Sequence, residues 1–295
     1  MGAKLRQIRR RIRSVQSTMK ITRAMEMIAA SRIRRAQQAM DRARPYAEQI
    51  TAAIQDITSQ GGVLDHPLLK VRENADTAGI LVITSDRGLC GAYNANILRH
   101  TEQLIARLRE EGKEPRMYVS GRKGIAYFRF RERPVADSWE GYSEQPKYSD
   151  AKRAADALIG AYANGDIDEI HIVYTHFRSM LSQAPEARKM VPLVVEEEAA
   201  PRGPRPLYIF EPEPGEILND LLSRYVEARV FAAMLEAAAS EQSARQRAMS
   251  SATENAEELI KSYTRIANQA RQTEITTEIM DIVGAAEALA TSGSE

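Results

Sequence analysis

The sequence is poor in several features that mark particular classes of protein. It contains one cysteine, Cys90, among 295 residues, so it cannot form an internal disulfide and fits a reducing compartment. No apolar run approaches the roughly 20 residues that a membrane-spanning helix needs. The basic N-terminus lacks the apolar core and the cleavage site of a signal peptide. We therefore expect a chain that is soluble, or that reaches a membrane only through a partner.

Glycine and proline are absent from two long terminal stretches, one between Gly2 and Pro45 and the other from Glu216 to Val283. In the first stretch, apolar residues recur at steps of three and four, which keeps them on one face of a helix. This spacing continues past Pro45, although proline usually bends or ends a helix, so the pattern predicts one helix over residues 3–58. The predicted seam is interrupted between Met19 and Met25 and then resumes. Its members are Leu5, Ile8, Ile12, Val15, Met19, Met25, Ala29, Ile33, Ala36, Met40, Ala43, Ala47, Ile50, Ile54 and Ile57.

The second stretch predicts a longer helix over residues 215–290, which begins after the turn signal "EPEPGE". At 1.5 Å per residue the two helices would be roughly 80 and 110 Å long, and each has a narrow apolar seam. We therefore predict that they pair as an antiparallel coiled coil. Because alanines on a seam bury little area, we expect another protein to surround part of it. The predicted stripe of the second helix is Leu218, Leu221, Tyr225, Ala252, Ala256, Leu259, Tyr263, Ile266 and Ala270.

The middle of the chain has a different pattern. Short apolar, β-branched runs at 78–84, 117–121 and 169–177 predict strands, and amphipathic segments at 94–112 and 149–165 predict helices. This alternation indicates a central Rossmann-like α/β domain with a parallel sheet. The predicted fold class is thus α/β with a long antiparallel two-helix coiled coil formed by the N- and C-terminal helices. The predicted domains are the first coiled-coil helix, the α/β domain and the second coiled-coil helix, at 1–60, 61–212 and 213–295.

The segment "TSDRGLCGAYN" (84–94) follows a predicted strand and precedes a predicted helix, where α/β enzymes often place their sites. It matches neither the phosphate-loop nor the dinucleotide pattern. Cys90 could be a nucleophile, but no histidine is tied to it by a pattern, so a buried cysteine is the better interpretation. His171 and His176 are five apart in a predicted strand and should point to opposite faces, which disfavours zinc. The motifs predict no catalytic residue, no metal and no cofactor.

Charge is distributed unevenly along the chain. Residues 1–45 carry thirteen Lys or Arg against two acids, whereas residues 216–290 carry seven against twelve. The basic segment indicates an acidic partner, which could be nucleic acid, anionic lipid or an acidic protein surface. It has no aromatic residue before Tyr46 to stack on bases. A membrane-surface helix typically carries bulky Trp, Phe or Leu on its apolar face, whereas the apolar face of this segment is mostly Met, Ile and Ala. An acidic protein surface is therefore the favoured interpretation.

Several long motifs, in order, resemble the gamma subunit of bacterial-type ATP synthase. They are "MKITRAMEMIAASRIRRAQ", "ITSDRGLCGAYNANI", "LYIFEPEP", "LLSRYVEARVF", "SEQSARQRAMSSATENAEELI" and "RQTEITTEIMDIVGAAEAL". The resemblance implies a non-catalytic rotor of the central stalk, which couples proton flow to ATP synthesis or hydrolysis. Its implied partners are three alpha and three beta subunits around the coiled coil, the epsilon subunit and the c-ring, with no nucleic acid. The implied location is peripheral, on the cytoplasmic side of the cell membrane, held there through the complex.

The resemblance also implies roles for individual residues. Those matched to coupling with the catalytic head are Met25, Arg245, Arg271, Gln272, Thr276 and Glu278. Those matched to the foot, where the family contacts the c-ring and epsilon, are Tyr208, Glu211, Asp86, Arg87 and Cys90. Two broader alternatives stay open at this point: an α/β enzyme that binds a small ligand, and a nucleic-acid binder with salt-dependent affinity.

Overall fold

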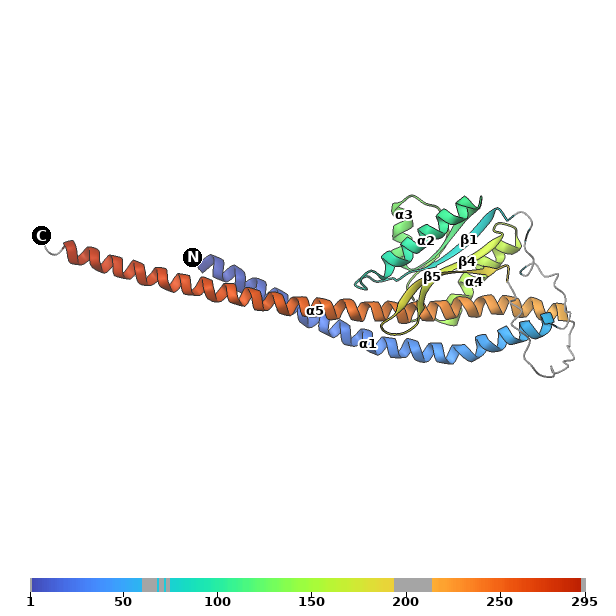
Figure 1. Cartoon of the computed structure of the whole chain (residues 1–295), viewed down its shortest axis with the longest axis horizontal. Coiled ribbons are helices and arrows are strands. Elements are labelled where there is room, and N and C mark those ends of the chain that lie inside the picture. Colours follow the sequence, from blue (N-terminus) through green and yellow to red (C-terminus); the bar gives the residue numbers. More distant parts are fainter. Residues whose placement is uncertain (1, 60–67, 69–71, 73–74, 194–213, 293–295) are drawn as a thin grey trace. The chain divides into compact units, whose positions relative to one another are not determined.

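The computed structural model of the protein describes residues 2–59, 68, 72, 75–193 and 214–292. The described chain alternates helices and strands between two long terminal helices (Figure 1). The elements, in chain order, are α1 (Gly2–Ser59), β1 (Thr77–Ile83), α2 (Tyr93–Glu110), β2 (Glu114–Ser120), α3 (Arg122–Phe130), β3 (Val135–Trp139), α4 (Tyr148–Ala163), β4 (Glu169–Phe177), β5 (Gln183–Val191) and α5 (Pro214–Ser292).

These elements form two compact units. The helical unit contains Met1–Ile28 and Gln246–Glu295, and the sheet unit contains Ala29–Arg245. Helices α1 and α5 therefore each contribute one part to each unit. The sequence predicted three domains, with boundaries after residues 60 and 212. That division follows the order of the elements, and it stays a prediction.

Both terminal helices are continuous, as predicted. Helix α1 has 58 residues and passes through Pro45, and α5 has 79 residues. Within each unit the two helices run in opposite directions (Figure 1). The three-and-four spacing of α1 marks its packed face correctly, because Ile8, Ala29, Ile33 and Ile50 on it are buried. The predicted antiparallel helix pair is therefore confirmed.

A pair of threonines fills the interruption in the apolar seam of α1. Thr22 is buried, and its Oγ1 atom lies 2.7 Å from the Oγ1 atom of Thr253 on α5. Each threonine also lies within hydrogen-bonding distance of a carbonyl in its own helix, that of Met19 or Met249. The position where the sequence has no apolar residue is thus a buried polar layer of the helical unit.

The predicted stripe of α5 is partly wrong. Leu259 and Ile266 are 47% and 38% exposed, whereas Ala256 and Ala267 are buried. Within the sheet unit, α5 is buried on nearly all sides between residues 226 and 245. There it packs into the same core as α1, α4 and the sheet, so its pattern is not the narrow seam of a two-helix coiled coil. Leu218, another member of that stripe, lies among the side chains that the structure does not describe.

The central sheet has five strands in the order β3-β2-β1-β4-β5. Strands β1, β2, β3 and β4 are parallel, and β5 pairs with β4 in the antiparallel direction. Side chains alternate across the sheet, so Ile80 and Val82 face the core with α2 and α3, while Leu81 and Ile83 face the core with α4 and α5. The predicted Rossmann-like α/β domain is confirmed. Elements α3, β3 and β5 were not predicted.

Candidate functional site

The loop between β1 and α2 was predicted as a site, and it makes many hydrogen bonds with neighbouring segments. It begins at Thr84, at the carboxyl end of β1, and it contains Asp86, Arg87 and Cys90. The Asn94 carboxamide at the start of α2 accepts the Ser85 backbone N–H at 3.0 Å. Leu89 adopts a left-handed backbone conformation with φ of 62°, which is rare for a bulky residue. Local polar contacts therefore hold the loop in a shape that keeps Leu89 in this unfavourable conformation.

Asp86 holds three loops together at the carboxyl edge of the sheet. Its Oδ1 atom accepts the backbone N–H of Arg122, at the start of α3, at 3.1 Å. Its Oδ2 atom accepts the backbone N–H groups of Gly141 and Ser143, which follow β3, both at 2.9 Å. In open α/β sheets this edge is where anionic ligands commonly bind backbone N–H groups. Here a carboxylate of the chain itself occupies these donors.

Gly121, directly after β2, lets the backbone approach Thr84 at the start of this loop closely. It has φ of +100°, and a Cβ atom there would lie 2.3 Å from the Thr84 carbonyl oxygen. The Thr84 hydroxyl donates to the Ser120 carbonyl at 2.9 Å and accepts the Gly124 backbone N–H at 2.9 Å. The glycines of this turn therefore have a packing role.

Helix α5 contacts the loop through Arg245. This side chain is buried, and its Nη2 atom lies 3.3 Å from the carbonyl oxygens of both Arg87 and Gly88. The same nitrogen lies 2.6 Å from Oε1 of Glu241, one turn earlier on α5. Burial raises the pKa of Glu241 to about 7, against the opposing effect of Arg245. One buried arginine thus attaches the loop to α5.

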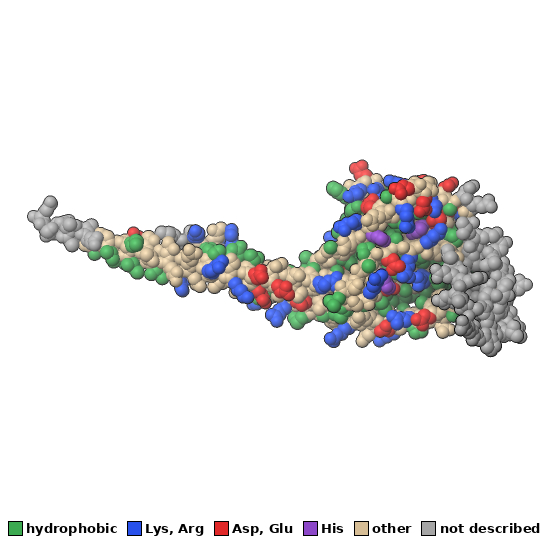
Figure 2. Space-filling view, in the orientation of Figure 1, with side chains coloured by type: hydrophobic (Ala, Val, Ile, Leu, Met, Phe, Trp, Pro, Cys, Tyr) green, Lys and Arg blue, Asp and Glu red, His purple; other side chains and the backbone are tan. Residues whose placement is uncertain are grey.

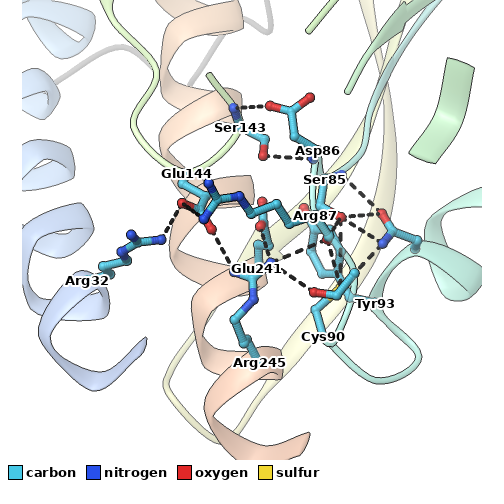
Figure 3. Close-up of polar contacts among 12 residues, drawn as sticks. Arg32, Ser85, Asp86, Arg87, Cys90, Tyr93, Ser143, Glu144, Glu241 and Arg245 are labelled. Atoms are coloured by element: carbon cyan, nitrogen blue, oxygen red, sulfur yellow. Dashed lines mark hydrogen bonds and ion pairs between the residues drawn. The ribbon is translucent and has the colours of Figure 1, made fainter. Parts of the chain in front are cut away.

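Glu144, which follows β3, completes what we call the Glu144 cluster: Arg32, Arg87, Glu144, Glu241 and Arg245. Its carboxylate forms an ion pair with Arg32 of α1, and it lies 3.8 Å from Nη1 of Arg87 and 3.5 Å from Nη1 of Arg245. Figure 3 shows these side chains converging from α1, α5 and the loop. Arg32 is therefore engaged inside the sheet unit.

Cys90 is a buried thiol, as the sequence favoured. It lies 3.8 Å from the Ser85 hydroxyl oxygen, and Asn94 Nδ2 donates to its sulfur at 3.3 Å. Burial raises the pKa of the thiol, which disfavours the reactive thiolate. His171 and His176 both lie in β4 and contact different carboxylates, Glu169 and Glu236. In the described part of the chain, no group of three or more His, Cys, Asp or Glu residues could hold a metal ion.

The structure brings together only some of the predicted site residues. Asp86, Arg87, Cys90 and Arg245 form one neighbourhood, although the resemblance matched Arg245 to the head and the others to the foot. Met25 is half-buried on α1 in the helical unit. The exposed predicted residues of α5 in that unit are Arg271, Gln272, Thr276 and Glu278. Tyr208 and Glu211 lie outside the described residues.

Sequence reasoning missed Glu144 and Glu241. The spacing of Glu241 and Arg245, four residues apart in a predicted helix, was a readable signal for a pair on one helix face. Glu144 lies in a loop whose sequence carries no pattern, and its partners are 57, 101 and 112 residues away along the chain. Only the folded arrangement reveals it.

Comparison with known proteins identifies the family. A family model described as ATP synthase matches residues 4–289. The chain is 57% identical over 301 residues to the ATP synthase gamma chain of Acidothermus cellulolyticus, covering 100% of both chains. It is 56% identical over 296 residues to that of Frankia casuarinae, covering 98% of this chain and 99% of the relative.

Solved structures show the same fold. A chain of the Euglena gracilis mitochondrial ATP synthase (OSCP/F1/c-ring) has a TM-score of 0.68 at 18% identity, covering 98% of this chain and 95% of that one. A chain of the Tetrahymena thermophila central stalk and c-ring has a TM-score of 0.60 at 22% identity, covering 79% and 99%. The chain belongs to the family of ATP synthase gamma chains, the rotor subunits of the central stalk.

Proposed function

We propose that this chain transmits rotation between a c-ring and a catalytic head of alpha and beta subunits, and that it contributes no catalytic residue itself. The observation that carries the proposal is the pair of unbroken helices of 58 and 79 residues. Each helix takes part in both units, so it provides a continuous covalent and hydrogen-bonded path between them. Such a path can carry torque without any chemistry in the chain.

The surface of the helical unit supports the proposal. Large apolar side chains of α5 are exposed there, and Figure 2 shows hydrophobic surface on this unit. Exposed apolar residues in number usually mark contact with another protein. The exposed members in this part of α5 are Leu259, Ile266, Ile275, Ile279, Met280, Ile282 and Val283. A surrounding catalytic head would cover them.

For the coupling contacts, we propose that Arg271, Gln272, Thr276 and Glu278 touch the catalytic head. All four are exposed, so their side chains are accessible to a partner. Met25 is half-buried, and we propose that its accessible part serves the same contact. The proposed contacts of Tyr208 and Glu211 with the c-ring and epsilon rest on the family resemblance.

The enzyme alternative meets a specific obstacle. The backbone donors at the carboxyl edge of the sheet, which could cradle an anionic ligand, are bonded to Asp86. An open cleft of about 660 Å³ does lie beside them. Most charged side chains that line it are paired with one another, as in Arg122 with Glu140 and Arg153 with Asp150. The cleft therefore offers few uncompensated charges to a substrate.

We propose that the protein lies at the cytoplasmic side of the cell membrane as a peripheral part of its complex. Within the residues that the structure describes, no helix combines the length and apolar character that crossing a bilayer requires. Attachment through a c-ring would supply the membrane contact instead. The predicted division into two coiled-coil helices and an intervening foot domain is part of this proposal.

Affinity purification from native membranes tests the proposal. A tag on this chain should recover alpha, beta and epsilon subunits in a complex with ATP hydrolysis activity, and the isolated chain should show no ATP hydrolysis. Recovery of the chain without these subunits would overturn it. Steeply salt-dependent DNA affinity of the isolated chain, or tight binding of a small ligand, would favour one of the two alternatives.

A further inference from the structure

Glu144 is the one carboxylate of its cluster that contacts three separate parts of the sheet unit. It pairs with Arg32 of α1, it lies 3.5 Å from Nη1 of Arg245 on α5, and it lies 3.8 Å from Nη1 of Arg87 in the loop after β1. Its own side chain is 19% exposed. Figure 3 shows it between α1 and α5.

Its three partners differ in what else they bond. Arg245 is buried and already holds Glu241 and two loop carbonyls. Arg87 is 73% exposed, so its side chain points largely to the surface. For Arg32, Glu144 is the carboxylate partner found among the described residues. Glu144 is therefore the direct polar link between α1 and the rest of the cluster.

We propose that Glu144 is a positioning residue for torque transmission: its carboxylate fixes α1 and α5 to the loop that presents Arg87. The proposal rests on the proposed rotor function. A twisting load applied to the sheet unit must reach both long helices, and the charged contact holds them to the same loop. Without it, α1 loses its ion pair with this edge of the unit, and the apolar packing that remains is non-directional.

Glu102 provides a matched control. It is a half-buried carboxylate of the same unit and also has several partners, with Oε1 and Oε2 within 3.0 Å of Arg133 Nη1 and Oε1 3.0 Å from the Tyr127 hydroxyl. These contacts join α2 to α3 and to the turn after it, and they involve neither α1 nor α5. Glu102→Gln therefore removes a comparable set of charged contacts that does not connect α1 or α5 with the loop after β1.

The experiment compares ATP-driven proton pumping with ATP hydrolysis in reconstituted complexes. Glu144→Gln should lower the number of protons pumped per ATP hydrolysed, because α1 loses its ion pair with the loop while ATP hydrolysis in the head continues. Glu144→Asp, which keeps the charge, should retain more of the ratio, and Glu102→Gln should keep the wild-type ratio. A wild-type ratio for Glu144→Gln, or an equal loss for Glu102→Gln, would overturn the proposal.

If Glu144→Gln prevents assembly, the same comparison is made at Arg32. Arg32→Lys keeps a positive charge facing Glu144 and should preserve the ratio better than Arg32→Gln does. Equal ratios for the two variants would overturn the proposal. Failure of the rotor function itself is distinguishable, because the wild-type complex would then hydrolyse ATP without pumping.

Discussion

Asp86 binds backbone groups of two neighbouring loops. Its carboxylate accepts N–H groups from Arg122, Gly141 and Ser143, which belong to two other loops. A polar group that loses its only partner on partial burial costs more than the bond it made. The residue that the family resemblance matched to a subunit contact thus has an internal role in this fold.

We expect Asp86→Ala to lower the free energy of unfolding by about 1 to 3 kcal/mol, because its three donors lose their acceptor. Asp86→Asn should cost less, since one amide oxygen still accepts. Denaturant unfolding of the purified full chain measures both. Asp137→Ala is the control, because among the residues that the structure describes this exposed carboxylate bonds the neighbouring Ser138 N–H. An equal loss of unfolding free energy at positions 86 and 137 would contradict the role of Asp86 in joining the loops.

Glu241 should make stability depend on pH near neutrality. Burial raises its pKa from 4.5 to about 7, so the folded chain binds more protons than the unfolded chain between these values. Its contribution to stability is therefore present below about pH 4.5 and is lost as the pH rises to about 7. Arg245 pairs with this carboxylate from one turn along α5, and Glu144 and Ser143 also act on it from the segment after β3.

The test compares wild type with Glu241→Gln. The stability of wild type relative to the variant should fall between about pH 4.5 and about pH 7. Other titrating groups, such as Glu169, whose pKa is lowered to about 2 by its lysine and histidine partners against its burial, are common to both proteins and cancel. Denaturation midpoints across this range provide the measurement. A difference that does not change with pH would show that Glu241 stays ionised throughout.

At the scale of elements, the two terminal helices were predictable and the burial of α5 was not. The spacing of Ile8, Ile33 and Ile50 on α1 marks its buried face, because α1 packs along one side. Helix α5 is buried from residue 226 to 245 by the sheet together with α1 and α4, so no single stripe describes it. The Glu144 cluster was unpredictable because its members are distant in sequence and meet only after folding.

The threonine layer of the helical unit gives a prediction at this scale. Thr22→Val leaves the Thr253 hydroxyl without its partner on α1, and we expect a cost of about 1 kcal/mol. The double variant Thr22→Val and Thr253→Val should cost less than the sum of the two single variants, because it removes both hydroxyls at nearly constant volume. Thermal unfolding of the full chain measures the three. Additive losses would contradict a direct Thr22–Thr253 bond.

At the scale of the whole molecule, surface charge should govern contact with the head. Arg34 and Arg35 are exposed on α1, whereas Arg32 pairs internally with Glu144. We expect Arg34→Glu with Arg35→Glu to weaken assembly at low salt while leaving the chain folded, since exposed pairs are each worth about 0 to 1 kcal/mol. Arg32→Glu should in addition destabilise the sheet unit.

Complex formation at several salt concentrations, together with circular dichroism, provides the measurement. Charge reversal of Arg99 and Arg109, which are exposed on α2, changes the net charge equally and is the control. An equal loss for the α2 variant would assign the effect to overall charge. Unfolding of the Arg34 and Arg35 variant would show that these arginines stabilise the fold.

Rotation of this chain within its complex is the central claim, and direct observation tests it. A probe fixed to an exposed position of the sheet unit reports the angle of the chain while the catalytic head is held on a surface and ATP is supplied. The account predicts continuous rotation in one direction, with a pause for each catalytic site. ATP hydrolysis by the same immobilised complex with the probe stationary would contradict the account.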